Sequence, residues 1–464
     1  MKHIDEHRIN SLLNTLNTKV TNIELNTILN KTKDLQRLSI EETAKLLLVK
    51  EHQNLQKIYA AASYVKNTIY GKRIVMFVPL YISNHCSNSC LYCGFAANNK
   101  RTIRKKLTFE EIKQQTEILL KKGHKRILVV AAEMTSSKEN LDYYVGAVKS
   151  IYSANYNGNK IKRVNINVAP MDIESFKILK TSGIGTYQIF QETYHEETYR
   201  KLHIAGAKTD PNNRLDAIDN AFKAGIDDVG IGPLLGLYDP YFEILAMMMH
   251  IEYLEKNYGI GPHTISVPRI EPAPGSTYAS NPEYKISDEE FKKIVAVLRL
   301  SVPYTGIIIS TRETAQLRDE LVNLGVSQIS AESKVTPGGY DINFSHNDNL
   351  ERQFSLNDQR TLDEIIKSLL AQGYVPSFCA ACYRKNRTGE NFMNLAKPGQ
   401  IKNMCDINAL VTLKEYLEDF ASPEVKEIGY NLIEKSRARL DNASLKILDK
   451  FFKDIDDGIR DSYI

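Results

Sequence analysis

Three cysteines stand within eight residues in the segment HCSNSCLYCGF, residues 85–95. Cys86, Cys90 and Cys93 form a C-x3-C-x2-C pattern on a loop that can surround a compact metal centre. Thiolates at such spacing bind zinc or iron–sulfur clusters. Three thiolates on a four-iron cubane leave one iron open for chemistry, whereas a structural zinc site normally has four ligands, and His85 could be the fourth. The segment therefore predicts a metal centre, with zinc as the alternative to a cluster.

A second group of three cysteines lies near the C-terminal end of the sequence. Cys379, Cys382 and Cys405 form C-x2-C-x22-C, and with the first group they account for all 6 cysteines. A close pair joined by one distant thiol again supplies three ligands. This pattern favours a second cluster with an open iron, and zinc with an added fourth ligand is the alternative.

The composition excludes several classes of protein. Of 464 residues 42% are hydrophobic and 25% are charged, as in ordinary globular proteins. The 60 basic and 56 acidic residues are interspersed, so the net charge of +4 does not indicate a nucleic-acid partner. The first twenty residues lack the apolar run of a signal peptide, and no later run is long enough to span a membrane. We therefore expect a cytoplasmic protein, in which cysteines bind metals or react rather than form disulfides.

The elements that position these cysteines begin with a helical segment over residues 1–73. Ser39 and Glu42 form a capping box ahead of a run from Thr43 to Tyr70 that contains no Gly or Pro. We expect this run to be one long helix.

From residue 74 short β-rich runs alternate with amphipathic segments that begin with capping residues such as Thr108, Asp172, Ser287 and Thr361. The β-rich runs are 74–83, 126–133, 163–170, 185–192, 227–236, 263–272, 305–313 and 328–333. Eight such alternations predict an α/β fold, a (β/α)8 TIM-type barrel, and an open doubly wound sheet is the alternative. In both folds the active site lies at the carboxyl ends of the strands. The first cysteine group follows strand one at that end.

The pattern divides the chain into three domains. These are an N-terminal helical extension, 1–73, the barrel, 74–345, and a mostly helical C-terminal domain, 346–464. The last boundary is placed in a polar, Asn-rich stretch at 340–358. Beyond it we expect a helix ending at Gly373, a cysteine-bearing loop and two or more further helices.

The first cysteine group, with the CLYCGF sequence around it, resembles the signature of the radical S-adenosylmethionine (SAM) enzymes. In that family the open iron of a 4Fe-4S cluster binds SAM, which is cleaved to a 5′-deoxyadenosyl radical. The resemblance implies that Glu133 contacts SAM, although Ala131 and Ala132 stand where relatives have two glycines. It also implies that Arg214 contacts the SAM carboxylate and that GIGPLLG, residues 230–236, packs against adenine.

The C-terminal segment CAACYRKNRTGENFMNLAKPGQIKNMCDINALVTLKEYLEDFAS resembles the HydG family of FeFe-hydrogenase maturases, and the likeness continues through SVPRIEPAPGS in the barrel. It implies that the radical takes a hydrogen from L-tyrosine, whose Cα–Cβ bond breaks to give p-cresol and dehydroglycine. Dehydroglycine becomes CO and cyanide at an auxiliary 4Fe-4S cluster with an additional iron (5Fe). The product implied is an Fe(CO)(CN) synthon bearing cysteine for the H-cluster of the hydrogenase.

The same resemblance assigns three further residues. His263 matches the histidine that holds the fifth iron, and it begins a strand, on the barrel face opposite the SAM site. Arg312, at the carboxyl end of its strand, is the candidate for gripping the tyrosine carboxylate, since a guanidinium fork fits a carboxylate. Ser330 is expected to assist, and Arg269 is a weaker candidate for the role of Arg312.

The implied partners are the small molecules L-tyrosine, SAM, cysteine and iron, together with other hydrogenase maturases and an electron donor, without nucleic acid or membrane. Two other functions remain open. A 2-iminoacetate synthase of thiamine biosynthesis, the ThiH type, would cleave tyrosine but lacks the C-terminal cysteines. A zinc-stabilised scaffold or binding protein would hold zinc and turn over no SAM.

Overall fold

A computed structural model describes residues 1–15, 20–134, 137–341 and 348–464. All eight expected β-rich runs form parallel strands. They are β1 (Arg73–Ser83), β3 (Arg126–Ala131), β4 (Arg163–Asn167), β5 (Tyr187–Gln188), β7 (Val229–Ile231), β8 (Thr264–Ser266), β9 (Gly306–Ile309) and β10 (Gln328–Ser330). They pair in chain order, and β10 pairs back to β1, with Val75 opposite Gln328. The closed barrel is confirmed, and the open doubly wound sheet is excluded.

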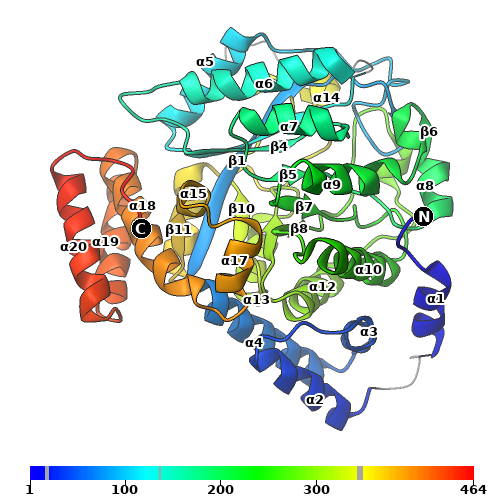
Figure 1. Cartoon of the computed structure of the whole chain (residues 1–464), viewed down its shortest axis with the longest axis horizontal. Helices are drawn as coiled ribbons and strands as arrows, with labels where there is room; N and C mark the ends of the chain where they lie inside the picture. Colours follow the sequence, from blue (N-terminus) through cyan, green and yellow to red (C-terminus); the bar gives the residue numbers. More distant parts are fainter. Residues whose placement is uncertain (16–19, 135–136, 342–347) are drawn as a thin grey trace.

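Helices surround the barrel, as Figure 1 shows. Those that follow the strands are α5 (Phe109–Lys121), α6 (Ser137–Ser153), α7 (Ile173–Thr181), α9 (Asn213–Lys223), α10 (Pro240–Tyr258), α12 (Asp288–Ser301) and α13 (Ala315–Leu324). The expected caps form. Thr108 and Glu111 complete a capping box, and the Asp172 side chain accepts the backbone N–H of Ser175 at 2.8 Å.

Four helices make the N-terminal extension: α1 (Glu6–Thr15), α2 (Asn22–Lys33), α3 (Ile40–Leu47) and α4 (His52–Tyr70). They pack against the barrel helices α10, α12 and α13. The expectation of one helix from Thr43 to Tyr70 is wrong, because α3 ends at Leu47 and α4 begins at His52. The turn between them buries Val49, so tertiary packing breaks a run that local propensity would have continued.

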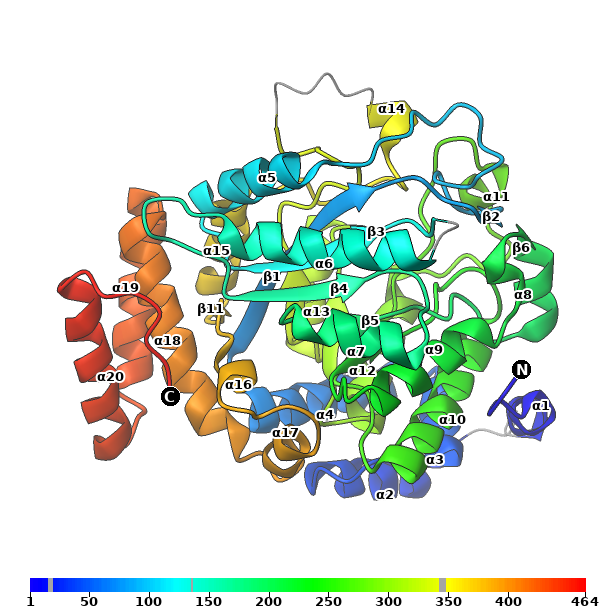
Figure 2. The same cartoon turned by 45° about the horizontal axis from the view of Figure 1, so that its top comes forward.

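The C-terminal part contains α15 (Leu362–Ala371), β11 (Val375–Ser377), α16 (Ala381–Arg384), α17 (Gly389–Ala396), α18 (Ile401–Asp419), α19 (Pro423–Arg437) and α20 (Asn442–Asp456). We expected only a loop where β11 lies. It pairs in parallel with the start of β1, with Arg73 opposite Val375. In Figure 2 the β1 arrow starts beside β11 and α16 and points away from them. The second cysteine group therefore lies at the amino end of the barrel strands.

Several short elements lie at the other end of the barrel. The first cysteine loop contains β2 (Ser89–Cys90), which pairs antiparallel with β6 (His203–Ala205). Helix α8 (Glu196–Leu202) and a 3-10 turn (Ala207–Thr209) occupy part of a segment that we expected to be a long loop. Two further short helices are α11 (Thr277–Ser280) and α14 (Asp348–Glu351).

The boundary that we placed between residues 345 and 346 lies outside the described residues. The chain after it returns to the barrel, where the Gln353 N–H donates to the Val335 carbonyl at 3.0 Å and the Ser355 N–H to the Pro272 carbonyl at 2.8 Å. The division into three domains stays a prediction.

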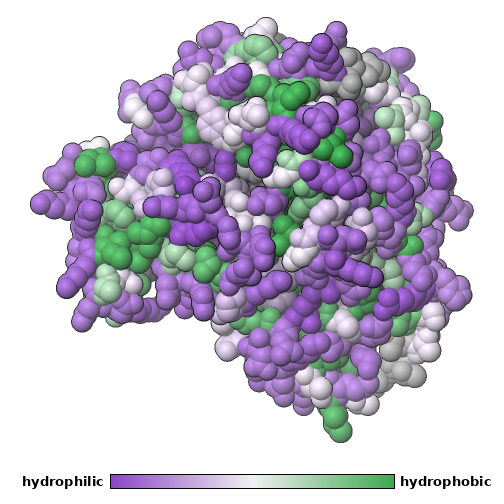
Figure 3. Space-filling model, in the orientation of Figure 1, coloured by the Kyte–Doolittle hydropathy of each residue, from purple (hydrophilic) through white to green (hydrophobic). Residues whose placement is uncertain are grey.

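The surface is polar for the most part. In Figure 3 hydrophilic residues cover most of the visible face, and hydrophobic ones gather over the C-terminal helices. Among the described residues no helix is both long and apolar enough to cross a bilayer.

Candidate active site and second cysteine site

A cavity of about 210 Å³ lies at the carboxyl ends of the barrel strands. Most of the residues that we predicted for the first site line it: Cys86, Cys90, Cys93, Glu133, Arg214, Arg312 and Ser330. The chain supplies these residues from five separate segments. Barrel closure is what brings them to one place.

Hydrogen bonds hold the loop of the first cysteine group in shape. The Arg104 guanidinium donates to the carbonyl oxygens of Asn84, Phe95 and Ala96 at 2.8, 2.7 and 2.6 Å. The Phe95 N–H also points at the Cys93 sulfur, at 3.4 Å. One half-buried cation thus fixes the backbone that presents the thiols to the cavity.

Glu133 and Arg214 form a buried ion pair in this cavity. The Asn88 side-chain amide donates to the Glu133 carboxylate at 2.7 Å. Burial alone would raise the pKa of Glu133, but the charges of Arg214 and Lys208 hold this pKa below its ordinary value. The two residues predicted to contact SAM are therefore adjacent and both charged.

The two alanines that replace the family's glycines end β3. Ala131 pairs with Ser83 of β1, and the Ala132 N–H donates to the Ser83 carbonyl at 3.0 Å. Both alanines line the cavity. Two methyl-bearing residues therefore form this part of the cavity wall, at the positions where the family resemblance implies glycines.

A second ion pair, between Lys208 and Glu192, lies in the same cavity and was not expected from the sequence. The Lys208 ammonium lies 2.6 Å from the Glu192 carboxylate, and both line the cavity. Glu192 has a φ of +71°, a conformation that non-glycine residues rarely adopt outside functional sites. It ends the expected strand 185–192, so the strand-end rule could have found it. Lys208 follows α8, and nothing in its sequence marks it.

Arg312 is placed to bind an anion. Its guanidinium carbon lies 3.4 Å from the centre of the Phe354 ring, and it donates to the Arg269 carbonyl at 3.4 Å. In the part of the chain that the structure describes, it forms no ion pair. Ser330 stands nearby in the cavity wall and accepts the Thr311 N–H at 3.3 Å. A guanidinium fork without a carboxylate partner therefore lines the cavity beside a hydroxyl group.

Arg269, the weaker candidate for the same role, is used elsewhere. It forms ion pairs with Glu313 and, at 2.8 Å, with Asp288, and it donates to the Ile286 carbonyl at 3.0 Å. Because two carboxylates of the chain already hold its fork, the structure does not support Arg269 as a substrate ligand.

Two residues from the stretch that we read as a domain boundary belong to the cavity wall. The Gln353 amide oxygen accepts the Tyr81 hydroxyl at 2.8 Å, and its amide nitrogen lies 3.7 Å from the Cys93 sulfur. Phe354 supports Arg312. Sequence reasoning missed both because a polar, Asn-rich stretch is more typical of a linker.

A second cavity, of about 50 Å³, lies at the amino ends of the strands. It is lined by all residues predicted for the second site: Cys379, Cys382, Cys405 and His263. Three arginines that the sequence did not single out also line it: Arg73, Arg126 and Arg387. Burial alone would lower the pKa of Arg73, but the nearby thiols of Cys405 and Cys379 raise it. The cavity is built to hold negative charge.

His263 lies beside a buried carboxylate. Its Nδ1 lies 3.9 Å from Asp228 Oδ2, and its ring centre lies 4.5 Å from that of Phe392. Asp228 is 2% exposed, and neither of its carboxylate oxygens has a hydrogen-bond partner among the described residues. A carboxylate beside one ring nitrogen favours the tautomer that leaves Nε2 free for a metal.

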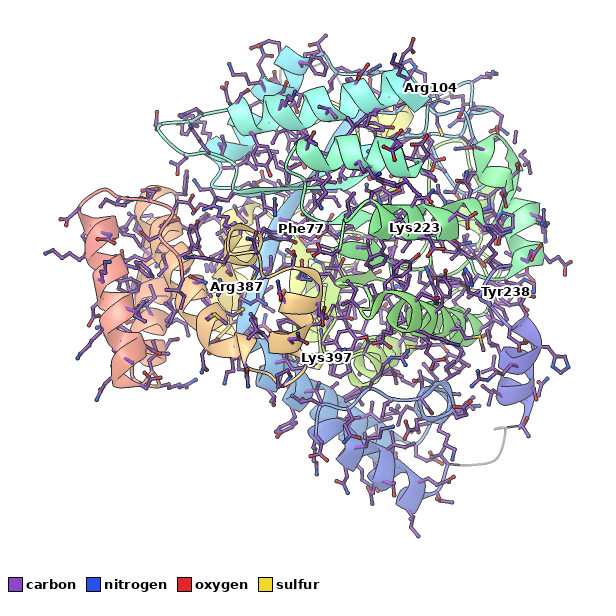
Figure 4. All side chains as sticks on the ribbon, viewed as in Figure 1. Phe77, Arg104, Lys223, Tyr238, Arg387 and Lys397 are labelled. Carbon is purple, nitrogen blue, oxygen red and sulfur yellow. The ribbon has the colours of Figure 1, made fainter. Side chains whose placement is uncertain are left out.

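Two successive layers of side chains in the barrel separate the two cavities, one layer facing each. On four strands a residue lines the second cavity and the residue two positions later lines the first, as in the pairs Val75 and Phe77, Arg126 and Leu128, Gly306 and Ile308, and Gln328 and Ser330. Residues two apart on a strand point to the same side, here the barrel interior. Figure 4 shows Phe77 near the middle of the molecule, between Arg104 and Arg387.

The donor sets of both sites fit iron–sulfur clusters. Each offers three thiols, all free of disulfides, on the wall of a cavity. Burial raises the pKa of Cys90 and of Cys405 to about 12, so their thiolates need the positive charge of a bound metal. Across the described residues no three His, Cys, Asp or Glu side chains surround a single ion position. A cubane cluster does not need such a position, because its three thiolate ligands each bind a different iron.

The comparisons with known proteins agree with this geometry. Residues 80–251 match the model of the radical SAM superfamily, and residues 266–375 match the biotin and thiamin synthesis associated domain. The chain is 32% identical to 2-iminoacetate synthase of Salmonella typhimurium, over 73% of this chain and 86% of that protein. A crystal structure of HydG, a maturase of the FeFe-hydrogenase, is 43% identical, covers 100% of both chains and has a TM-score of 0.94.

The chain belongs to the HydG family of radical SAM enzymes. The structure of HydG from Carboxydothermus hydrogenoformans is also similar, with 40% identity over 96% of this chain and 97% of that one and a TM-score of 0.84. As a HydG-family member the chain is a radical SAM lyase, and its superfamily uses a 4Fe-4S cluster and SAM. This excludes the zinc-stabilised scaffold.

Proposed function

We propose that this protein cleaves the Cα–Cβ bond of L-tyrosine to p-cresol and dehydroglycine and converts dehydroglycine to CO and cyanide, building an Fe(CO)(CN) synthon for hydrogenase maturation. The observation that carries the proposal is the pair of thiol-lined cavities at opposite ends of one barrel, walled by successive layers of side chains. A barrel with one chemical site needs only the first of these cavities. The second is provided by the C-terminal segment and β11.

In the first cavity Cys86, Cys90 and Cys93 would hold a 4Fe-4S cluster, which with SAM supplies a 5′-deoxyadenosyl radical. The chain's own charged pair, Glu133 with Arg214, offers a carboxylate to an ammonium group and a guanidinium to a carboxylate. Both groups occur on an amino acid such as the methionyl part of SAM. Burial of the pair strengthens these contacts, because the low dielectric screens charges poorly.

Arg312 would orient the tyrosine. Phe354 stacks on its guanidinium and thereby restricts its rotation, and the carboxylate of an amino acid can accept both arms of the fork. Ser330 adds a hydroxyl donor beside it. Fixing the carboxylate places the remainder of a bound tyrosine in one orientation, which is the requirement for abstraction of a single hydrogen.

The barrel interior would keep the reactive fragment from water. Apolar side chains of Phe77, Leu128 and Ile308 line the first cavity on the side of the second. Dehydroglycine released there would need to pass between the side chains of two successive layers to reach Cys379, Cys382 and Cys405. Loss into bulk solvent would end its use, so an enclosed path favours conversion at the second site.

In the second cavity the iron that becomes part of the product is a substrate, and His263 would bind it. We expect His263→Ala to lower the iron content of the reconstituted protein by about one atom per chain, from about nine, and to leave p-cresol release unchanged. Asp228→Leu should weaken the retention of this iron by roughly tenfold or more, because it removes the carboxylate that orients the imidazole. Iron analysis after gel filtration measures both.

The control for this experiment is His52→Ala, which changes an exposed histidine on α4. Full iron content in His263→Ala would remove His263 from the second site. Loss of p-cresol in the same variant would show instead that the change disturbs the first site.

The alternative in which the reaction ends at dehydroglycine has support from the similarity to 2-iminoacetate synthase. The two functions differ in whether CO is formed in addition to p-cresol. An anaerobic assay for CO beside p-cresol decides between them.

A further inference from the structure

The first cysteine loop and the segment after it are unusually basic. Residues 85–109 contain five Lys or Arg and no Asp or Glu, although acidic and basic residues are nearly balanced over the whole chain. The five are Lys100, Arg101, Arg104, Lys105 and Lys106. A run of residues with charges of one sign beside a catalytic site creates a local electrostatic field that attracts molecules of the opposite charge.

Much of this charge is available to a partner. Lys100, Arg101 and Lys106 are exposed, and in the described part of the chain neither Lys100 nor Arg101 forms an ion pair. Ile103 stands between them with 47% of its surface exposed. Figure 4 places Arg104 at the upper edge of the molecule. Exposed cations close in sequence to an exposed apolar side chain are typical of a surface for protein association.

The same surface reaches a cluster ligand. A hollow of about 430 Å³ on the outside of the loop is lined by His85, Cys86, Arg104, Lys106 and Glu139, among others. Cys86 lines both this hollow and the inner cavity. The loop is thus a thin wall with the first cysteine in it, and only this wall separates the cluster site from the basic surface.

Radical SAM chemistry on this site, which is the proposed function on which the inference rests, requires one electron from outside for each cleavage of SAM. We propose that the basic surface formed by Lys100, Arg101, Ile103 and Lys106 docks an acidic protein that carries a low-potential one-electron centre. In the transfer the partner's reduced centre loses one electron and the cluster at Cys86, Cys90 and Cys93 gains it. No bond forms or breaks in this step, and no proton moves.

The test uses the reconstituted full-length protein and a two-cluster bacterial ferredoxin as the acidic probe. In Lys100→Glu/Arg101→Glu we expect the second-order rate of cluster reduction by reduced ferredoxin, followed by stopped-flow absorbance, to fall at least tenfold at low salt. The difference should shrink in 0.5 M KCl, because salt screens surface charges. Glu139→Gln, which removes an acid from the hollow, should leave the rate equal or higher.

Two controls separate docking from other effects. Lys223→Glu makes the same kind of change on α9, at the other end of the barrel, and should leave the rate within twofold of wild type. Dithionite, a small reductant that needs no docking surface, should reduce all variants at the wild-type rate and support normal p-cresol release. Loss of dithionite-driven p-cresol in wild type would contradict the proposed function and not this inference.

An unchanged ferredoxin rate in Lys100→Glu/Arg101→Glu would overturn the docking proposal. So would an equal loss with dithionite, since that result means a damaged cluster site. Tighter binding of a mixed-sequence RNA than of the ferredoxin to this surface, measured by competition, would also overturn it in favour of a nucleic-acid partner.

Discussion

Replacing Cys379 with alanine is expected to leave p-cresol release from L-tyrosine within about twofold of wild type and to lower CO release by at least tenfold. Cys379 lines only the cavity at the amino ends of the strands, together with His263 and the other two C-terminal cysteines. Removing one of three thiolates weakens or abolishes a cluster there. The cleavage of tyrosine depends on the other cavity, so it should continue. Gas analysis and chromatography of one reaction vial measure both products.

Cys86→Ala is the matched variant of the first site, and it should abolish both products. Without Cys86 the first cavity keeps two thiols and cannot hold a cubane with one open iron. The pair of variants therefore separates cleavage from the later chemistry. Normal CO from Cys379→Ala would contradict a catalytic role of the second cysteine group.

Arg312→Gln is expected to raise the KM for L-tyrosine by roughly a hundredfold, which corresponds to about 3 kcal/mol for a lost charge-assisted bidentate contact. The side chain stays long and polar, but the charge and the fork are lost. The KM for SAM should change by less than about threefold, because SAM is assigned to Glu133 and Arg214. Initial rates of p-cresol release, with each substrate varied in turn, give both constants.

Two further variants test whether the fork of Arg312 matters as well as its charge. Arg312→Lys keeps the charge and should raise the KM for tyrosine by only about tenfold. Arg269→Lys changes a neighbouring arginine whose partners are Glu313 and Asp288, and it should leave this KM within about twofold. An equal rise in the KM of SAM and of tyrosine in Arg312→Gln would remove Arg312 as a specific tyrosine ligand.

Local sequence patterns predicted most of the barrel. Each of the eight strands is a short β-rich run, and most are followed by a helix that begins with a capping residue, so side chains close in sequence decide both features, as at Thr108 and Glu111. Glu133 was singled out by the resemblance to the radical SAM enzymes and Arg312 by its place at the carboxyl end of a strand, and both line one cavity. The spacing of the six cysteines needed no structure at all.

Contacts between distant segments account for the features that the sequence did not predict. Strand β11 has three residues and is defined by its pairing with β1, some 300 residues earlier. The break between α3 and α4 depends on burial of Val49. Gln353 reaches Cys93 across 260 residues of sequence. None of these contacts leaves a local pattern.

Charged pairs inside the cavities were also beyond sequence reasoning. Lys208 with Glu192, and Asp228 with His263, lie on different strands or loops, and lone charged residues in a sequence are usually at the surface. Burial is what makes these pairs informative, since a carboxylate such as Asp228 without a hydrogen-bond partner is costly to keep.

The most direct test of the account is one anaerobic turnover of the reconstituted protein with SAM, dithionite and L-tyrosine, in which p-cresol and CO are measured in the same vial. We expect both products, with CO appearing after p-cresol and approaching it in amount. Cleavage of tyrosine without any CO would contradict the second chemical site, and the absence of both products would contradict tyrosine as the substrate.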